Sequence, residues 1–198
     1  VSSHYFIKKN GDVILLVPDL YIAWHAGKSS WRNYSSLNKY SIGIEISNPG
    51  HQFNYRKFSK KQINSILCLS RFLIKKYNIK PENILGHSDI APNRKKDPGE
   101  KFPWKYLAKN KISIWHSLSR NLLKKNRCVK INDKDTKLFL NNLYKIGYFK
   151  NLSKNLNKTS YLRSIIKAFQ RRFRQELISG KIDKECLIIS NNLIKKYY

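Results

Sequence analysis

The first part of the chain shows the alternation of hydrophobic and polar positions that is typical of β-strands. Two such runs lie between residues 4 and 17, on either side of Asn10-Gly11, a dipeptide that favours a tight hairpin turn. Residues 41–47, with the sequence SIGIEIS, place three isoleucines on one side and Glu45 on the other. The pattern therefore predicts a β-hairpin and a further strand in which Glu45 points away from the apolar face.

A helical period replaces this alternation in the middle of the chain. Ser59 and Gln62 form the pattern of a capping box, and apolar residues recur at helical spacing to about Asn78. After Pro81, residues 83–86 are predicted to form a short buried strand. The following segment, HSDIAPNRKKDPG, contains the proline and glycine residues that are typical of a loop. Loops at strand ends often carry functional groups, so this loop is the first candidate for a site.

The last third of the chain is predicted to be helical. Residues from Trp104 to about Asp133 are rich in Lys and Asn and weakly periodic, as expected of a crossover segment or linker. Helical runs then follow at residues 135–146, 160–173 and 183–197. The expected fold class is therefore α/β, with the strands and the first helix followed by a small three-helix unit.

Composition narrows the class of partner. The 198 residues include 40 Lys and Arg but 12 Asp and Glu, a net charge of +28, which favours an anionic partner such as nucleic acid, acidic lipid or a carboxylate-bearing polymer. A general bias towards Lys, Asn and Ile would explain the charge equally well. Nucleic-acid binding is not expected, because no zinc-finger, helix-turn-helix or RNA-recognition motif is present. No run of the sequence has the roughly 18 apolar residues needed to span a membrane.

Three residues of the loop suggest hydrolytic chemistry. Hydrolysis of an amide needs an activated water, a base and a positive group for the oxyanion. His87 and Asp97 are acceptable zinc ligands, and Lys95 lies two residues before Asp97. A catalytic zinc typically has three protein ligands, so this loop supplies two, and the same residues are also compatible with a helix cap and a surface acid.

Four motifs together resemble one known family in order and approximate spacing. They run from residue 1 to about residue 115 and are similar to those of the type 2 N-acetylmuramoyl-L-alanine amidases, the bacterial AmpD/AmiD group: VSSHYFI, WHAGKSSWR, LNKYSIGIEISN and GHSDIAPNRKKDPG. The resemblance implies a zinc-dependent hydrolase that cleaves the amide bond between N-acetylmuramic acid and L-alanine in peptidoglycan or muropeptides, during cell-wall turnover. It predicts a mixed β-sheet flanked by helices in an amidase domain at residues 1–118, which is expected to lack the first strand of the family fold. A linker at 119–133 and a three-helix domain at 134–198 are expected to follow.

The resemblance also assigns roles to particular residues. It implies that His87 and Asp97 bind zinc, that Glu45 is the general base or orients the water, and that Lys95 stabilises the oxyanion. From the residues alone, a solvated acid on a strand is the better interpretation of Glu45.

The WHAG motif lines the substrate groove in the family. The resemblance therefore places Trp24 and His25 in that groove, with Arg32 just beyond them. A core position for Trp24 is an equally good interpretation of the residue itself.

The last three helical runs resemble, less specifically, the peptidoglycan-binding module that often follows this amidase domain. The similarity rests on IIKAFQRRFRQ and GKID. Phe169 and Phe173 are expected to pack in the core. Arg171, Arg172 and Arg174 are expected either on a solvated basic face or against stem-peptide carboxylates.

One feature of the family has no counterpart in this sequence. Its first zinc ligand is a His ahead of the VSSHY motif, and the chain starts at Val1, so the third ligand is expected to be missing upstream. The competing hypothesis is therefore a peptidoglycan-binding remnant with impaired catalysis; if the zinc site is complete nevertheless, His4 or His25 is the next candidate ligand. The expected partner is peptidoglycan or a muropeptide, the expected location is the periplasm or cell envelope, and the chain is expected to be a monomer.

Overall fold

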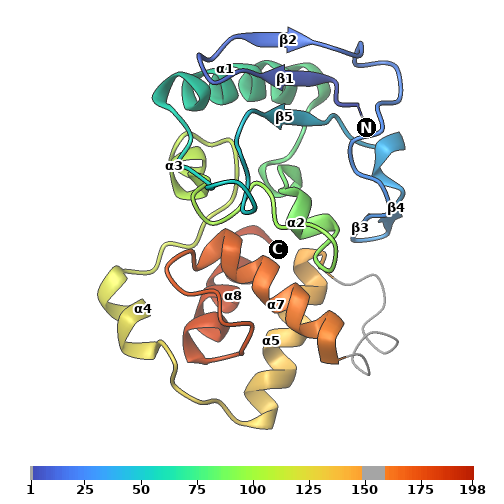
Figure 1. Cartoon of the computed structure of the whole chain (residues 1–198). Helices are drawn as coiled ribbons and strands as arrows, with labels where there is room; N and C mark the ends of the chain where they lie inside the picture. The colour runs from blue at the N-terminus through green and yellow to red at the C-terminus, as the bar shows by residue number, and fades with distance from the viewer. Residues whose placement is uncertain (1, 149–158) are drawn as a thin grey trace. The chain divides into compact units, whose positions relative to one another are not determined.

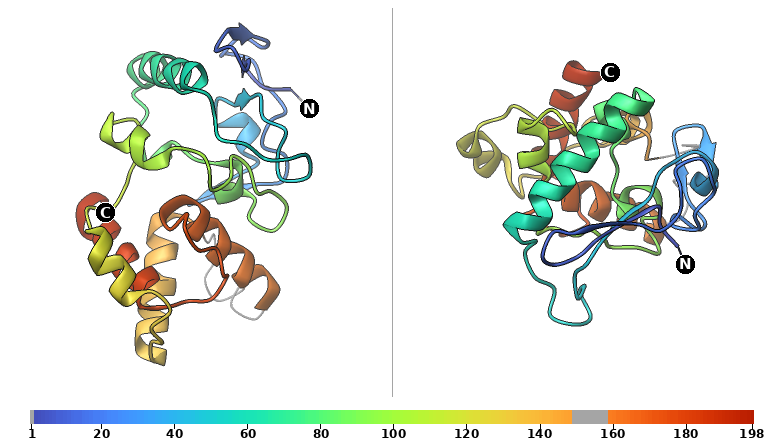
Figure 2. Two further views of the ribbon diagram at one scale, coloured as in Figure 1. Left: turned by 60° about the vertical axis from the view of Figure 1, so that its left-hand side comes forward. Right: turned by 90° about the horizontal axis from the view of Figure 1, so that it is seen from above.

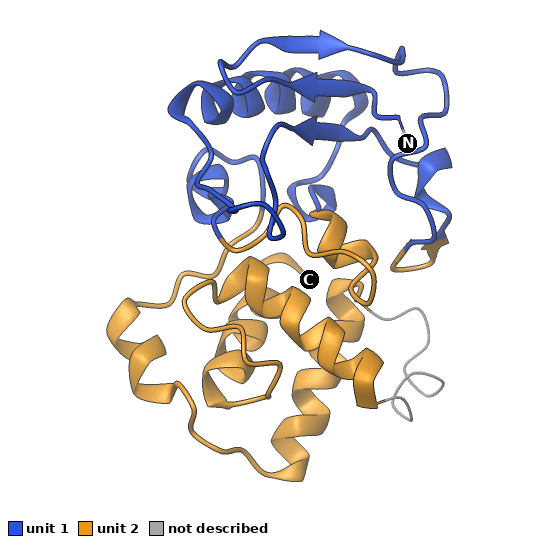
Figure 3. Ribbon diagram, viewed as in Figure 1, with its two compact units in different colours: residues 1–29, 35–85, 101–113 blue, residues 30–34, 86–100, 114–198 orange. Residues whose placement is uncertain are grey.

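The computed structural model describes residues 2–148 and 159–198 and contains two compact units. Figure 3 shows them in different colours. Unit 1 consists of Val1–Ser29, Ser35–Leu85 and Lys101–Ser113, and unit 2 consists of Ser30–Tyr34, Gly86–Glu100 and Ile114–Tyr198. No helix within the described ranges is long and apolar enough to cross a lipid bilayer.

A three-stranded mixed sheet forms the centre of unit 1 (Figure 1). Strand β1 (Tyr5–Ile7) pairs antiparallel with β2 (Val13–Leu15) and parallel with β5 (Ile44–Ile46). The turn between β1 and β2 contains Gly11, whose φ of 94° favours glycine because a Cβ would be strained there. The predicted hairpin is confirmed, and so is the predicted strand, in which Glu45 is exposed.

Helix α1 (Lys60–Tyr77) covers this sheet, as the two views of Figure 2 also show. Ser59 Oγ accepts a hydrogen bond from the backbone N–H of Gln62 at 3.1 Å, and the side-chain oxygen of Gln62 accepts one from the N–H of Ser59 at 3.0 Å. Asn78 ends the helix in a left-handed conformation. Both predicted ends of the helix are therefore confirmed, and its apolar face buries Ile66, Leu67, Leu69 and Leu73.

The segment after α1 differs from the prediction at two places. Residues 83–86 form no strand: the chain makes a 3-10 turn, η2 (Pro81–Asn83), and continues extended through Ile84. The predicted loop begins with a short helix, α2 (His87–Ile90). The reason is Asp89, whose carboxylate accepts a hydrogen bond from the N–H of Gly86 at 2.8 Å and so closes the start of the helix.

The remaining short elements connect these parts of the chain. The region from Trp104 to about Asp133, predicted as a crossover segment or linker, contains two short helices, α3 (Trp104–Lys109) and α4 (Arg120–Asn126). Strand β3 (Ser30–Trp31) pairs with β4 (Tyr34–Ser35), and a 3-10 turn, η1 (Leu37–Lys39), follows.

Unit 2 contains the three helices predicted for the end of the chain. They are α5 (Asp133–Ile146), α7 (Thr159–Phe173) and α8 (Lys184–Tyr197), and α5 packs along α8. Their shared core holds fully buried aromatic and aliphatic side chains, among them Phe139, Leu143, Phe169, Phe173 and Leu193. The prediction of a three-helix arrangement, with Phe169 and Phe173 in its core, is confirmed.

Candidate active site

The two residues predicted to bind zinc lie side by side in unit 2. His87 is the first residue of α2, and its Nδ1 lies 3.1 Å from Oδ2 of Asp97. The backbone N–H of Ser88 donates to the carbonyl of Asp97 at 2.8 Å, so the two ends of the loop are tied together. The side chain of Asp97 is 58% exposed, which leaves carboxylate oxygen accessible from solvent.

The charge state of Asp97 follows from its neighbours. Desolvation alone would raise the pKa of Asp97, but the hydrogen bond from His87, the charge of His87 and the nearby charge of Lys95 together lower it below its ordinary value. The carboxyl group is therefore ionised at neutral pH, which is the form that binds a metal ion. Lys95 is half-buried in the same loop, and its N–H donates to the carbonyl of Ala91 at 2.9 Å.

The pair fits only part of a zinc site. Imidazole and carboxylate are both zinc donors, and a catalytic zinc usually has three protein donors. Within residues 2–148 and 159–198, no three or more His, Cys, Asp or Glu side chains cluster so as to hold a metal ion. His87 and Asp97 thus account for two donors, and the described residues add no third one beside them.

The two other histidines near the predicted groove already have partners for both ring nitrogens. His4 is buried, with Nδ1 accepting from the N–H of Gly43 and Nε2 next to the carbonyl of Tyr21, both at 3.0 Å. His25 Nδ1 lies 3.0 Å from the carbonyl of Ala23, and Nε2 lies 2.9 Å from a serine hydroxyl. These contacts favour a structural role for His4 and His25.

The other predicted site residues are divided between the two units. Glu45, Trp24 and His25 belong to unit 1, whereas Arg32 belongs to unit 2 with the zinc-ligand candidates. Trp24 is 67% exposed, so it lies outside the core and its ring is accessible to a ligand. The guanidinium of Arg32 lies 5.2 Å from the ring centroid of Tyr198. The structure therefore brings His87, Asp97 and Lys95 together in one loop and leaves Trp24 and Glu45 accessible.

The arginines predicted for a basic surface or for substrate contacts are in part buried. Arg172 and Arg174 are 2% and 3% exposed. Arg174 pairs with Asp183 and, at 3.5 Å, with Glu185, whereas Arg172 pairs with Asp89 at 2.7 Å. The prediction of a solvated face was wrong for these two residues, because carboxylates inside unit 2 compensate their charges.

Asp89 is the residue near the site that the sequence pattern did not reveal. It stands three positions after Gly86, the spacing of a capping box, and this was the available signal. The capping-box pattern was not recognised because its first position is a glycine, whereas the usual cap is a residue with a side-chain oxygen.

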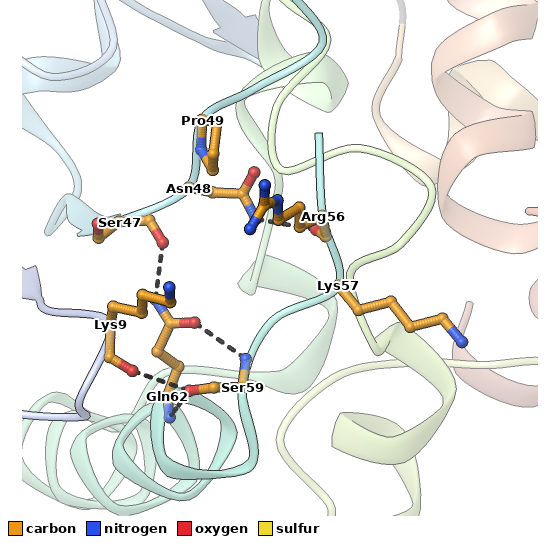
Figure 4. Close-up of a pocket in the computed structure, with 8 residues that line it drawn as sticks. All are labelled: Lys9, Ser47, Asn48, Pro49, Arg56, Lys57, Ser59 and Gln62. Carbon is orange, nitrogen blue, oxygen red and sulfur yellow. Dashed lines mark hydrogen bonds between the residues drawn. The ribbon is translucent and has the colours of Figure 1, made fainter. Parts of the chain in front are cut away.

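A pocket of about 380 Å³ in unit 1 lies at the start of α1, apart from the predicted site residues (Figure 4). Lys9, Arg56 and Lys57 contribute its cationic lining. Two of its other polar side chains are engaged within the chain: Gln62 donates to the carbonyl of Ser47 at 2.7 Å, and Ser59 donates to the carbonyl of Lys9 at 3.0 Å (Figure 4). These bonds anchor the loop that precedes α1.

Comparison with known proteins identifies the family. Residues 1–100 match the family described as N-acetylmuramoyl-L-alanine amidase (Amidase_2). The chain is 38% identical to the N-acetylmuramoyl-L-alanine amidase AmiD of Escherichia coli over 210 residues, which cover 100% of this chain and 75% of AmiD. The chain belongs to the N-acetylmuramoyl-L-alanine amidase family. It is thus an enzyme of this amidase class, and the resemblance carried by the four motifs is confirmed.

Solved structures of this amidase family show the same fold. AmiD in complex with the substrate anhydro-N-acetylmuramic acid-L-Ala-D-gamma-Glu-L-Lys superimposes with a TM-score of 0.87 at 36% identity, over 100% of this chain and 80% of that one. AmpDh3 of Pseudomonas aeruginosa gives a TM-score of 0.84 at 31% identity, over 100% and 83%. The 1,6-anhydro-N-acetylmuramyl-L-alanine amidase AmpD of Salmonella typhimurium is 36% identical, but over 52% of this chain and 54% of its own length. The predicted fold class is confirmed, and with AmiD the match includes the C-terminal helices.

Proposed function

We propose that this chain hydrolyses the amide bond between N-acetylmuramic acid and L-alanine in peptidoglycan fragments. The observation that carries the proposal is the contact between His87 and Asp97 in a chain of the amidase family. AmiD has been captured with an anhydro-muramyl peptide, and the AmpD relative is named for anhydro-muramyl substrates, so a muropeptide of this kind is the first substrate to test.

The proposed metal is zinc, held by His87 and Asp97 together with at least one further protein donor. When bound, zinc would polarise the amide carbonyl and lower the pKa of a bound water. The proposal also includes the domain boundaries expected from the sequence, and a location in the periplasm or cell envelope, where such a substrate is found.

The protein's own side chains are proposed to supply the other chemistry. Glu45 takes the proton of the attacking water and returns it to the leaving amine, which accelerates amide hydrolysis by general acid–base catalysis. The ammonium group of Lys95 lies opposite the negative charge that develops on the carbonyl oxygen, and it stabilises the transition state more than the ground state. The exposed ring of Trp24 packs against a sugar face.

The competing function is peptidoglycan binding with little or no turnover. It is favoured by one observation, that the described residues cluster two zinc donors where a catalytic site has three. This alternative keeps the family fold and the exposed Trp24 but requires no water activation.

The deciding experiment uses mass spectrometry to measure the release of L-alanyl peptide from an anhydro-muropeptide. The assay is run with added zinc and again after a chelator has removed zinc. Zinc-dependent release that falls about a hundredfold or more in Glu45→Gln supports the enzyme. Lys95→Ala should lower kcat while zinc, measured by elemental analysis, stays bound. Retention on insoluble peptidoglycan without peptide release would instead establish the binding protein.

A further inference from the structure

Helix α2, which carries His87, is too short to maintain its own geometry. It has four residues, whereas an isolated helix needs roughly 12 to be even marginally stable in water. His87 is its first residue, so the direction of the imidazole depends on what fixes α2 inside unit 2. Asp89, two residues further on, attaches α2 to the C-terminal helices.

Asp89 is buried and receives hydrogen bonds from three donors of unit 2. Its side chain is 1% exposed. Oδ2 accepts from the N–H of Gly86 at 2.8 Å and from Nη1 of Arg172 at 2.7 Å, and Oδ1 accepts from the hydroxyl of Tyr148 at 2.7 Å. The first bond closes the start of α2, and the other two tie this helix to α7 and to the end of α5.

The two distant partners are themselves held in place. Arg172 is 2% exposed, and its guanidinium lies 5.2 Å from the ring centroid of Phe173. Tyr148 is 3% exposed and packs edge-on against Trp31, with ring centroids 5.1 Å apart. Burial, followed by the charge of Asp89, raises the pKa of Tyr148 well above its ordinary value, so the hydroxyl keeps its proton and stays a donor.

We propose that Arg172 and Tyr148 are positioning residues for His87, acting through Asp89 and α2. The inference rests on the proposed function, in which His87 binds zinc. It gives the C-terminal helices a part in building the catalytic site, besides any role in wall binding. A buried charge pair suits this task, because removing one partner leaves the other charge buried and uncompensated, and this restricts α2 to one arrangement.

The test compares Tyr148→Phe and Arg172→Met with a matched control in the full chain. Tyr148→Phe removes a single hydroxyl, and Arg172→Met removes the charge at similar length. Arg174→Met is the control, because Arg174 is equally buried in unit 2 but pairs with Asp183 and Glu185 instead of α2. Thermal unfolding of each variant is measured first, so that stability and positioning are separated.

The first readout is the histidine side-chain spectrum of the metal-free protein by ¹H–¹⁵N NMR, with the His87 signals identified by their loss in His87→Gln. We expect these signals to shift or broaden in Tyr148→Phe and Arg172→Met, while the His4 signals and the Arg174→Met spectrum stay as in the wild type. The second readout is the zinc dissociation constant from competition with a chromophoric chelator. It should rise about tenfold in both test variants, as for other groups that orient a metal ligand, and not in the control.

Two results would overturn the positioning role. One is a folded Tyr148→Phe variant with wild-type His87 signals and zinc affinity; the other is an Arg174→Met variant that shifts His87 as strongly as Arg172→Met. If Arg172→Met does not fold, Tyr148→Phe decides alone. A wild-type chain that neither binds zinc nor releases peptide contradicts the proposed function, whereas the metal-free spectra still decide whether Asp89 and its partners orient His87.

Discussion

Gly43 occupies a position that a residue with a side chain cannot take without moving its neighbour. A Cβ built there would lie 2.3 Å from Cγ of His25, far inside van der Waals contact. His25 cannot easily retreat, because Nδ1 lies 3.0 Å from the carbonyl of Ala23 and Nε2 lies 2.9 Å from Oγ of Ser41. The glycine of the SIGIE motif is therefore explained by the close approach of an imidazole at the start of β5.

Gly43→Ala should destabilise unit 1, because the methyl group displaces His25 and breaks its hydrogen bonds. The expected loss is about 1–3 kcal/mol in the free energy of unfolding, as for other overpacked sites, measured by urea denaturation. In a His25→Gly background the three atoms that this methyl group would meet, Cγ, Cδ2 and Cβ of His25, are all absent, so the same substitution should cost much less. Equal losses in the two backgrounds would contradict the steric explanation.

Asp19 is a buried acceptor that joins β1 to α1. Its side chain is 5% exposed and accepts from the hydroxyl of Tyr5 at 2.6 Å, from Nζ of Lys76 at 2.9 Å and from the hydroxyl of Tyr77 at 2.8 Å. Burial would raise the pKa of Asp19, but these three hydrogen bonds outweigh it and lower the pKa below its ordinary value. Burial and then Asp19 raise the pKa of Tyr5 to about 12, so Tyr5 remains a donor.

A lowered pKa means that the ionised form of Asp19 stabilises the folded state, so this contribution is present above the pKa of the unfolded chain and is lost as the pH falls through the folded pKa. Asp19→Asn should therefore lower the free energy of unfolding by about 1–3 kcal/mol near neutral pH. The difference from the wild type should shrink below about pH 4. Denaturation at several pH values measures it, and a difference that does not change with pH would rule out this role of the carboxylate.

At the scale of secondary structure, the start of α1 depends on Ser59. Its hydroxyl accepts from the N–H of Gln62 at 3.1 Å and donates to the carbonyl of Lys9 at 3.0 Å, so one side chain caps the helix and ties it to the turn between β1 and β2. Because α1 covers the sheet of unit 1, fraying at this end of the helix would expose apolar surface of both the helix and the sheet.

Ser59→Ala should lower the free energy of unfolding by about 1 kcal/mol, the usual cost of losing a helix cap. Ser59→Thr keeps a hydroxyl and should stay close to the wild type. Chemical denaturation compares the three proteins. If Thr proves as destabilising as Ala, the hydroxyl is not the group that matters.

The contrast between α1 and α2 shows which elements the sequence pattern reveals. Helix α1 has a serine cap, a glutamine three residues later and an apolar stripe over 18 residues, so each local signal indicates the same helix. Helix α2 has four residues and a glycine at its cap, so it was predicted as loop. Residues 83–86 were predicted to form a buried strand, but Asn83 is exposed and Ile84 and Leu85 are only partly buried. No strand among the described residues pairs with them.

At the scale of the whole molecule, motifs identified the family but pairwise contacts stayed hidden. Asp89 and Arg172 are separated by 83 positions, and no periodicity of either segment indicates that they meet. The net charge was also a poor guide to these positions. In a chain with a net charge of +28, Arg172 and Arg174 were expected at the surface, but both are buried against carboxylates. The roles of Glu45 and Lys95 stay predictions until the variants are assayed.

The net charge leads to a prediction about how the whole chain meets its proposed partner. Most of the 40 Lys and Arg residues have no acidic counterpart, since the chain has 12 Asp and Glu, so an anionic polymer should be attracted over a large part of the surface. Retention on insoluble peptidoglycan should therefore fall steeply as salt rises from about 0.1 to 1 M, where the screening length drops from about 10 to 3 Å. A sedimentation assay measures it, with peptidoglycan whose carboxylates have been amidated as the control. If retention changes neither with salt nor with amidation, short-range contacts, such as stacking on Trp24, dominate the attachment.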